Sequence, residues 1–214
     1  LAAEKAAVFY NIDDAYSEGL AMAFVDAFDE ASVTVDEFTF TDGTDDYNAQ
    51  LTQIKNGNYD VVFIPSYVDS VGPILTQARA LDLGDTKFIG GDGWDGIEVD
   101  YATVAEGTYF GNHYAKTDPS DIIQDFVASY TAEYSKAPNA LGALAYDAVY
   151  ALVAAIENAD SLDSAAIVTA LQALEYNDAV TGAIKFDANG DPIKAITVIQ
   201  VVNGQHVVVK KVQG

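Results

Sequence analysis

The chain has 214 residues, half of them hydrophobic, so it can bury one large core or two smaller ones. It carries 10 lysines and arginines against 33 aspartates and glutamates, a formal net charge of -23 at pH 7. Such a surface repels phosphate backbones and anionic lipid, so nucleic acid and membrane surfaces are disfavoured as partners. The sequence has no cysteine, which excludes disulfides, thiolate metal sites and cysteine nucleophiles within these residues.

The first half of the chain alternates strand and helix patterns. Between the apolar strand-like runs lie helical patterns, the first with Leu20, Phe24 and Phe28 on one face. Repeated units of this kind predict a parallel sheet covered on both faces. The expected strands are residues 6–10, 33–40, 61–64, 88–90 and 108–110.

The second half changes to helices with wide apolar faces and few strands. Helices are expected at 122–134, 141–156 and 165–174, and strands at 180–186, 195–201 and 206–209. Asn203-Gly204 between the last two strands predicts a tight hairpin. Either the helices pack on one another or they are covered by something outside this sequence, and we favour the second interpretation. No uninterrupted apolar run reaches about 18 residues, so no membrane-spanning segment is predicted.

Three loops that follow predicted strands each carry an aromatic residue and a polar group. Tyr16 follows the first strand, Ser66 and Tyr67 follow the third, and Asp92 and Trp94 follow the fourth. The carboxyl ends of parallel strands meet at one edge of a sheet, so these loops are expected to surround a common cleft. A carboxylate beside aromatic walls suits a small molecule with one cationic end, such as an amino acid's ammonium, and an apolar body. We predict that these residues bind such a ligand.

The glycine loop GDGWDG, residues 91–96, also matches the dinucleotide-binding pattern G-x-G-x-x-G. A pyrophosphate requires bare backbone amides at a helix start, and Asp92 would place an anion against the phosphates. Recognition of an amine is therefore the better interpretation of this loop, and no nucleotide cofactor is expected.

Catalytic groups are scarce. The two histidines, His113 and His206, lack a convincing serine or carboxylate partner in sequence, and strand alternation predicts that His206 faces solvent. No G-x-S-x-G elbow occurs, and the turn at 187–191 lacks the glycine and glutamate positions of an EF-hand. We expect no metal and no enzymatic activity, and an enzyme using Asp92 or Asp95 as acid or base remains the weakest hypothesis.

Six short segments carry a family likeness that runs along nearly the whole chain. With them the sequence resembles the type I periplasmic binding proteins, specifically the leucine/isoleucine/valine-binding group of ABC transporter receptors. The segments are YSEGL (16–20), QLTQI (50–54), QAR (77–79), GGDGWD (90–95), ALAYDAV (143–149) and GAIKFDANGD (182–191).

The resemblance implies an α/β fold with a Rossmann-like parallel-sheet lobe, residues 1–110 and 191–214, and helices of an incomplete second lobe, residues 111–190. It implies that the residue at the place of Asp92 takes the ligand's ammonium and that aromatics at Tyr16 and Tyr67 line the pocket. It also implies a non-enzymatic receptor that delivers an amino acid or similar small molecule to an ABC permease. Such receptors work in the periplasm or outside the cell, associated with the cell surface.

The same resemblance implies that the first part of the N-terminal lobe, which holds the ligand's carboxylate, lies outside this sequence. The chain alone is then expected to bind weakly. The apolar faces of 122–134 and 141–156 are expected to meet that missing fragment or a second copy. An effector-binding sensory domain of a receptor or transcriptional regulator has this architecture too, and remains the alternative. The residues do not identify the ligand.

Overall fold

The computed structural model describes residues 3–31, 33–83 and 85–213, and the chain divides into two compact units. The first unit comprises Leu1–Gly111 and Gln200–Val207, and the second comprises Asn112–Ile199 and Val208–Gly214. The chain therefore enters the second unit near the predicted boundary at residue 110. Residues 191–199 and 208–214 group with the second unit, because the last two strands each run from one unit into the other. The assignment of these units to two receptor lobes stays a prediction.

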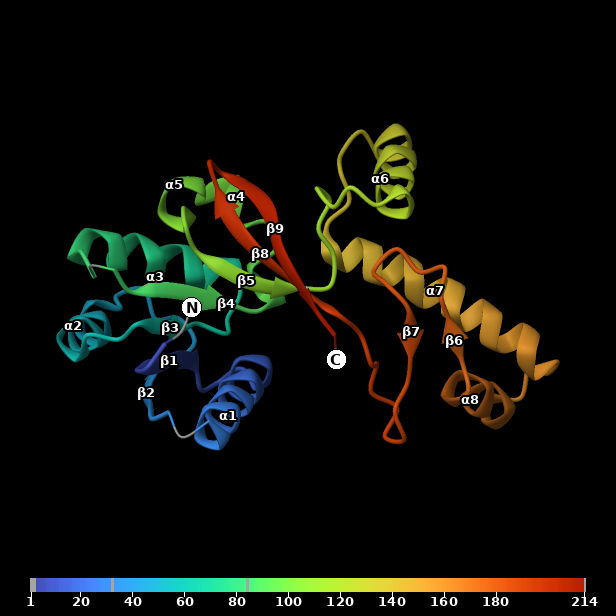
Figure 1. Cartoon of the computed structure of the whole chain (residues 1–214), viewed down its shortest axis with the longest axis horizontal. Helices are drawn as coiled ribbons and strands as arrows, with labels where there is room; N and C mark the ends of the chain where they lie inside the picture. The colour runs from blue at the N-terminus through green and yellow to red at the C-terminus, as the bar shows by residue number, and fades with distance from the viewer. Residues whose placement is uncertain (1–2, 32, 84, 214) are drawn as a thin grey trace. The chain divides into compact units, whose positions relative to one another are not determined.

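The first unit is built on a sheet whose pairings from β2 through β5 are parallel. Its order is β2-β1-β3-β4-β5-β8-β9 (Figure 1). This architecture confirms the predicted α/β fold with a Rossmann-like parallel sheet. The strands are β1 (Ala6–Asn11), β2 (Val35–Phe40), β3 (Val61–Phe63), β4 (Lys87–Gly90), β5 (Tyr109–Asn112), β8 (Ile196–Val202) and β9 (Gln205–Val212).

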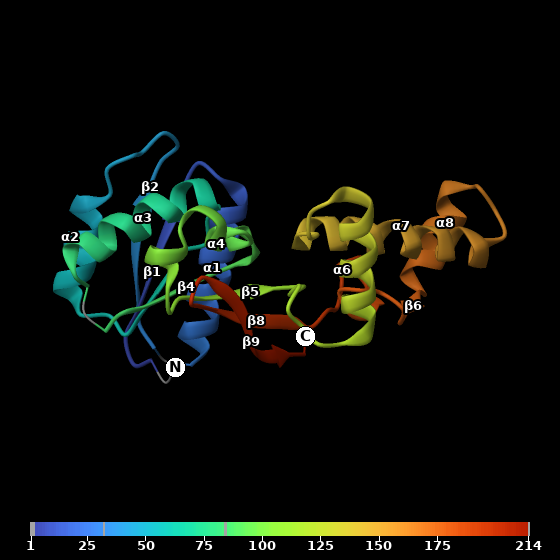
Figure 2. The same ribbon diagram turned by 90° about the horizontal axis from the view of Figure 1, so that it is seen from above.

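Helices cover both faces of the parallel part of this sheet (Figures 1 and 2). On one face, α1 (Ala15–Glu30) packs Leu20 and Phe24 against Val8 and Phe63. The other face carries helices that contact one another, and right-handed crossovers place them together there. They are α2 (Asn48–Gly57), α3 (Val68–Leu81), α4 (Ile97–Asp100) and α5 (Ala102–Ala105). The two short helices α4 and α5 are not predicted from the sequence.

The C-terminal hairpin is confirmed, but the orientation of His206 is not. Asn203 and Gly204 have φ of 51° and 68°, the left-handed values that a two-residue hairpin turn requires. His206 is 5% exposed, and its Nε2 lies 2.7 Å from Oε2 of Glu98 in α4. The prediction that His206 faces solvent is therefore wrong. Alternation shows which residues share a strand face, but it does not show that α4 covers that face.

The second unit contains α6 (Asp121–Tyr134), α7 (Ala140–Ala159), α8 (Ser164–Gln172) and the antiparallel pair β6 (Glu175–Tyr176) and β7 (Ile184–Lys185). The expected strand at 180–186 is only the two-residue β7. The reason is Asp147, which is buried in α7 and accepts hydrogen bonds from the N–H groups of Val180 and Thr181. These two amides therefore bond to a side chain instead of a neighbouring strand.

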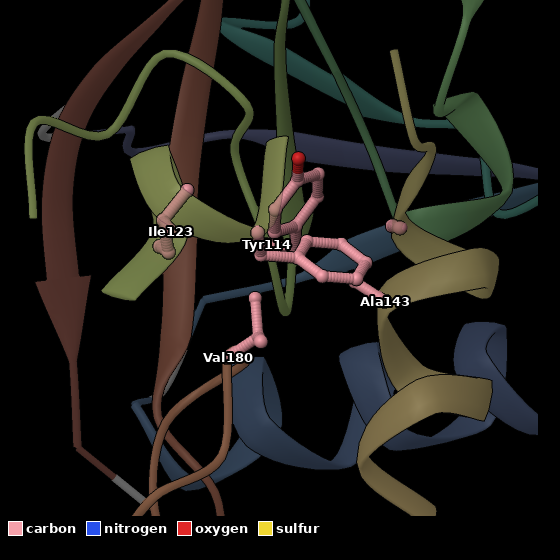
Figure 3. Close-up of a cluster of buried hydrophobic side chains, with 6 residues drawn as sticks. Tyr114, Ile123, Ala143 and Val180 are labelled. Atoms are coloured by element: carbon pink, nitrogen blue, oxygen red, sulfur yellow. The ribbon is translucent and has the colours of Figure 1, made fainter. Parts of the chain in front are cut away.

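A small apolar cluster joins α6 and α7 in this unit. Tyr114, Ile123, Ala143 and Val180 converge from separate segments of the chain (Figure 3). Phe126 and Ala140 complete this cluster. The cluster holds the start of α7 against α6.

Most of the apolar surface of α7 and α8 lies outside that cluster. Leu141 and Val149 on α7 are 67% and 60% exposed, and α8 has no buried residue. By length and composition alone, α7 could cross a membrane, and 28% of its apolar 18-residue stretch is buried inside the protein. Its buried Asp147, which accepts three hydrogen bonds, is instead typical of a helix packed in a folded protein.

Candidate ligand-binding site

The candidate site lies at the carboxyl ends of the adjacent parallel strands β1, β3 and β4. Tyr16 is in the first turn of α1, whose N-cap Asp14 accepts hydrogen bonds from the N–H groups of Tyr16 and Ser17. Tyr67 is the N-cap residue of α3, and Asp92 begins the short 3-10 helix η1 (Asp92–Trp94) after β4. Each predicted residue therefore sits on a short connection that a rigid strand positions.

Tyr16 and Asp92 are in direct contact. The Tyr16 hydroxyl donates a hydrogen bond of 2.7 Å to Oδ1 of Asp92 and accepts one of 2.9 Å from the N–H of Gly93. These residues lie 76 positions apart in the chain, so only the sheet brings them together. The hydrogen bonds fix the rotamer of Tyr16 and one oxygen of the carboxylate.

Tyr67 extends this arrangement into an aromatic wall. Its ring stacks on that of Tyr16, with centroids 4.8 Å apart and planes inclined by 26°. Tyr67 is 53% exposed, whereas Tyr16 is half-buried beneath it. One phenol ring of the pair thus remains open to a molecule that approaches Asp92.

Trp94 occupies a different place from the one its sequence position suggests. Its indole is 0% exposed, donates a hydrogen bond of 2.9 Å to the carbonyl of Ile64 and lies beside Phe110. A Cβ on Gly90 would lie 2.1 Å from this indole, so glycine is required there. The prediction that Trp94 lines the pocket is corrected: Trp94 supports the glycine loop from beneath, and the tyrosine pair forms the aromatic wall.

Ser66 is also largely enclosed by the same loop. It is 3% exposed, and a Cβ on Gly93 would lie 2.7 Å from its carbonyl oxygen. The three glycines of the G-x-G-x-x-G pattern thus have structural roles without a phosphate ligand. Gly91 and Gly93 allow close approach of the Tyr16 hydroxyl and the Ser66 carbonyl, and Gly96 has a φ of 88°. Ser66 precedes Tyr67 in this loop but is buried, as Trp94 is, so the prediction that it contacts the ligand is corrected as well.

Sequence reasoning missed Ser17. Its side chain is completely buried, accepts a hydrogen bond of 2.9 Å from the N–H of Asn11 and donates one to the carbonyl of Pro65. It thereby joins the loop after β1 to the loop after β3. The signal that could have found it is Asp14, whose position as an N-cap places Ser17 in the first turn of α1, facing the sheet edge.

The electrostatics of the site leave a negative charge for a ligand. Burial, and next the hydrogen bond to Asp92, raise the pKa of Tyr16 well above its ordinary value, so Tyr16 remains a neutral donor. Among the residues that the structure describes, no lysine, arginine or histidine forms an ion pair with Asp92. The group therefore offers a carboxylate, a hydroxyl and an exposed aromatic face, which together suit an organic ammonium.

Over the described ranges 3–31, 33–83 and 85–213, no group of His, Asp and Glu could hold a metal ion. His206 is engaged with Glu98. The turn at 187–191 is closed by its own contacts, with Asp187 accepting hydrogen bonds from the N–H groups of Asn189 and Asp191.

Comparison with known families identifies the class of protein. Residues 1–205 match the family described as periplasmic binding protein. The chain belongs to this family, whose members bind solutes and are not enzymes.

Several of the relatives that the chain resembles are named for the amino acids leucine, isoleucine and valine. The chain is 29% identical to a Leu/Ile/Val-binding protein homolog of Brucella melitensis over 88% of this chain and 51% of the relative. It is also 29% identical to the Leu/Ile/Val-binding protein of Escherichia coli over 82% of this chain and 47% of the relative. The chain thus spans about half the length of the curated relatives that it matches.

Solved structures agree with this placement. A leucine binding protein from Thermotoga maritima superposes with a TM-score of 0.90 at 32% identity, covering 99% of this chain and 61% of that one. The substrate binding protein of a branched-chain amino acid transporter from Streptococcus pneumoniae was solved with isoleucine. It superposes with a TM-score of 0.83 at 28% identity, covering 99% of this chain and 61% of that one.

Proposed function

We propose that this chain is part of the solute-binding receptor of an ABC transporter and recognises the ammonium end of an amino acid. The single observation that carries the proposal is the Tyr16, Tyr67 and Asp92 group, in which the Tyr16 hydroxyl donates to the Asp92 carboxylate and the Tyr16 ring stacks on Tyr67. The relatives named for leucine, isoleucine and valine make aliphatic amino acids the first ligands to test. The family's periplasmic setting fits such a role, with an ABC permease as the downstream partner.

Within this proposal, Asp92 pairs with the ammonium while Tyr16 holds the carboxylate in position. The exposed ring of Tyr67 contacts the ligand's apolar part or its Cα. The 2.7 Å hydrogen bond from the Tyr16 hydroxyl orients the Asp92 carboxylate before the ligand arrives. Groups for the ligand's carboxylate would come from parts of the complete protein outside this sequence.

The exposed apolar surface of α7 supports a second part of the proposal. Leu141, Val149 and Leu152 are each more than two-fifths exposed on one helix. We propose that the rest of the complete receptor covers this surface, and that the isolated chain self-associates through it. The amino acid would then bind tightly only when the complete receptor encloses it.

Calorimetry on the complete receptor tests the ligand. Leucine, isoleucine, valine and phenylalanine are titrated separately, and at least one aliphatic amino acid is expected to bind. Asp92→Ala should weaken that binding by about 2–5 kcal/mol, because it leaves the enclosed ammonium without its counter-charge.

The matched control is Asp69→Asn, an exposed carboxylate in the first turn of α3, near Tyr67. It removes the same charge without touching the Tyr16 hydrogen bond, and binding should hold within about a factor of two. Equal losses of affinity in Asp92→Ala and Asp69→Asn would mean that Asp92 attracts the ligand only through the net charge of the surface. Absence of heat with every amino acid would reject the ligand class.

A further inference from the structure

A buried ion pair in the first unit lies close in the chain to the proposed ligand site. Nε2 of His206 on β9 is 2.7 Å from Oε2 of Glu98 on α4, and the two side chains are only 3% and 9% exposed. Removing two such groups from water is costly, and apolar side chains of similar size often support a fold equally well. Stability alone therefore explains the pair poorly.

The backbone from Asp92 to Glu98 is short and internally bonded. The N–H of Asp95 donates a hydrogen bond of 3.0 Å to the carbonyl of Asp92, which closes η1. Gly96 follows at once with a φ of 88°, the left-handed conformation that turns the chain into α4. Ile97, the first residue of α4, is completely buried. A displacement of α4 would therefore be transmitted to Asp92, because the residues between them are held by these bonds and by burial.

Aromatic packing connects His206 to the same loop by a second route. Its imidazole packs edge-to-face on Phe110, with centroids 5.1 Å apart and planes inclined by 71°. Phe110 in turn lies 6.5 Å from the ring of Trp94, which follows Asp92 by two positions, and all three rings are buried. The imidazole therefore reaches this loop twice, directly at Glu98 and through Phe110 at Trp94.

We infer that His206 and Glu98 are positioning residues, which fix the loop after β4 so that the Asp92 carboxylate meets the ligand's ammonium. This role rests on the proposed function, because it concerns the same site. The two side chains are enclosed and act through the backbone of η1 and through Trp94, without touching the ligand. Such support matters because a movement of about 1 Å in the groups that hold a site is enough to spoil it.

Calorimetry on the complete receptor with leucine, isoleucine and valine tests this role. Glu98→Ala should weaken binding by about tenfold, because the loop is no longer held in one position. Glu98→Gln keeps the length of the side chain and an acceptor oxygen for the imidazole, so its affinity should stay within about threefold of that of the unsubstituted receptor.

The matched control is Glu106→Gln, because Glu106 is an exposed carboxylate that meets the same hairpin at the N–H of Gly204, 3.4 Å away. It removes the same charge but leaves the contact between His206 and Glu98 in place. Binding should change by less than about twofold.

A double-mutant cycle separates positioning from general stability. In the Asp92→Ala background no carboxylate is left to position, so adding Glu98→Ala should change the affinity by less than about twofold. A purely structural role would give the same loss in both backgrounds. Glu98→Asp keeps the charge but draws the carboxylate back by one methylene group. It should weaken binding by about threefold, and it replaces Glu98→Ala in these comparisons if that variant does not fold.

Hydrogen exchange in the ligand-free receptor measures the loop directly. Glu98→Ala should speed exchange in residues 91–98 by about tenfold and leave residues 6–11 of β1 unchanged. Because this measurement needs no ligand, it still decides the positioning role if no amino acid binds and the proposed function fails. Circular dichroism that shows native helix content in each variant excludes unfolding as the cause.

Three results would overturn the inference. One is an unchanged affinity for the amino acid in Glu98→Ala. Another is an equal loss of affinity in the presence and absence of the Asp92 carboxylate. The third is unchanged exchange in residues 91–98, which would show that the pair does not hold the loop.

Discussion

In the first unit, the strand β1 is buried along its whole length, whereas in the second unit α8 has no buried residue and α7 exposes Leu141 and Val149. The first unit covers the parallel part of its sheet with its own helices on both faces. The described residues of the second unit form long amphipathic helices but only the two short strands β6 and β7 besides the ends of β5, β8 and β9. Its described elements leave much apolar surface in solvent.

The difference shows that the two units are stabilised by different forces. Apolar packing dominates the first, as in the group formed by Phe9, Phe40 and Tyr47. In the second, two small apolar clusters are supplemented by polar contacts from buried carboxylates, chiefly Asp147 and Asp118. The ligand site that we propose, which needs fixed geometry, accordingly lies on the first unit.

Removing a core ring from the first unit should have the largest effect. Phe9 is completely buried and makes edge-to-face contacts with Phe40 and Tyr47. Phe9→Ala should lower the free energy of unfolding of this unit by about 3–5 kcal/mol, because burial is lost and a cavity remains. Urea titration followed by the fluorescence of Trp94, the single tryptophan, measures it.

The matched change in the second unit is Val149→Ala on the exposed face of α7. At concentrations low enough to keep the chain monomeric, it should alter the free energy of unfolding by no more than about 0.5 kcal/mol, since the side chain is then in water. A loss comparable with that of Phe9→Ala would mean that the α7 surface is covered in solution, and the contrast between the units would disappear.

The second prediction concerns the buried carboxylate of α7. Asp147→Ala leaves the N–H groups of Val180 and Thr181 and the Thr181 hydroxyl without their acceptor. We expect the free energy of unfolding of the second unit to fall by about 2–4 kcal/mol, because buried donors would be left without an acceptor. Hydrogen exchange followed by mass spectrometry should show faster exchange in residues 178–186, with Glu157→Gln on the same helix as the unaffected control. Unchanged protection would show that apolar packing alone holds this segment.

A small effect that depends on pH is expected at Asp118. Burial raises the pKa of this carboxyl, but the 2.6 Å ion pair with Lys211 and the hydrogen bond from the N–H of Ser120 outweigh it and lower the pKa. A lowered folded-state pKa stabilises the fold above the unfolded value of about 3.9, and the benefit is lost as the pH falls through the folded value.

Asp118→Asn should therefore lower the free energy of unfolding by about 1 kcal/mol or less at neutral pH. The difference in stability between the variant and the unsubstituted chain should shrink towards pH 3. Thermal unfolding at the two pH values, followed by circular dichroism, measures it. A difference that persists at low pH would mean that the side chain acts through its shape and not its charge.

Much of the first unit follows from local sequence signals. Apolar runs of strand length between helical patterns predict β1 to β5, and Asn203-Gly204 predicts the hairpin, because turn geometry depends on the residues at the turn. The meeting of Tyr16, Tyr67 and Asp92 also follows from order alone, since the ends of neighbouring parallel strands share one edge. Periodicity likewise predicts the α6, α7 and α8 helices, with bounds that differ by a few residues.

Other features depend on which neighbours arrive from distant parts of the chain. Trp94 follows the same strand as Asp92, yet its indole turns inward because Phe110 and the carbonyl of Ile64 receive it. Asp147 converts an expected strand into a clamped loop, although it lies 33 positions from Val180. No local pattern encodes either outcome.

By itself, the sequence determined the alternating α/β framework, the edge of the sheet where a ligand could bind and the sign of the charge that Asp92 offers there. These depend on residue spacing, turn chemistry and strand order, which are properties of neighbouring positions. Only the tertiary structure decided that Trp94 is a support and that His206 is buried against Glu98. Burial is the physical reason, because whether a side chain meets water, a ring or a carboxylate depends on segments packed against it from elsewhere in the chain.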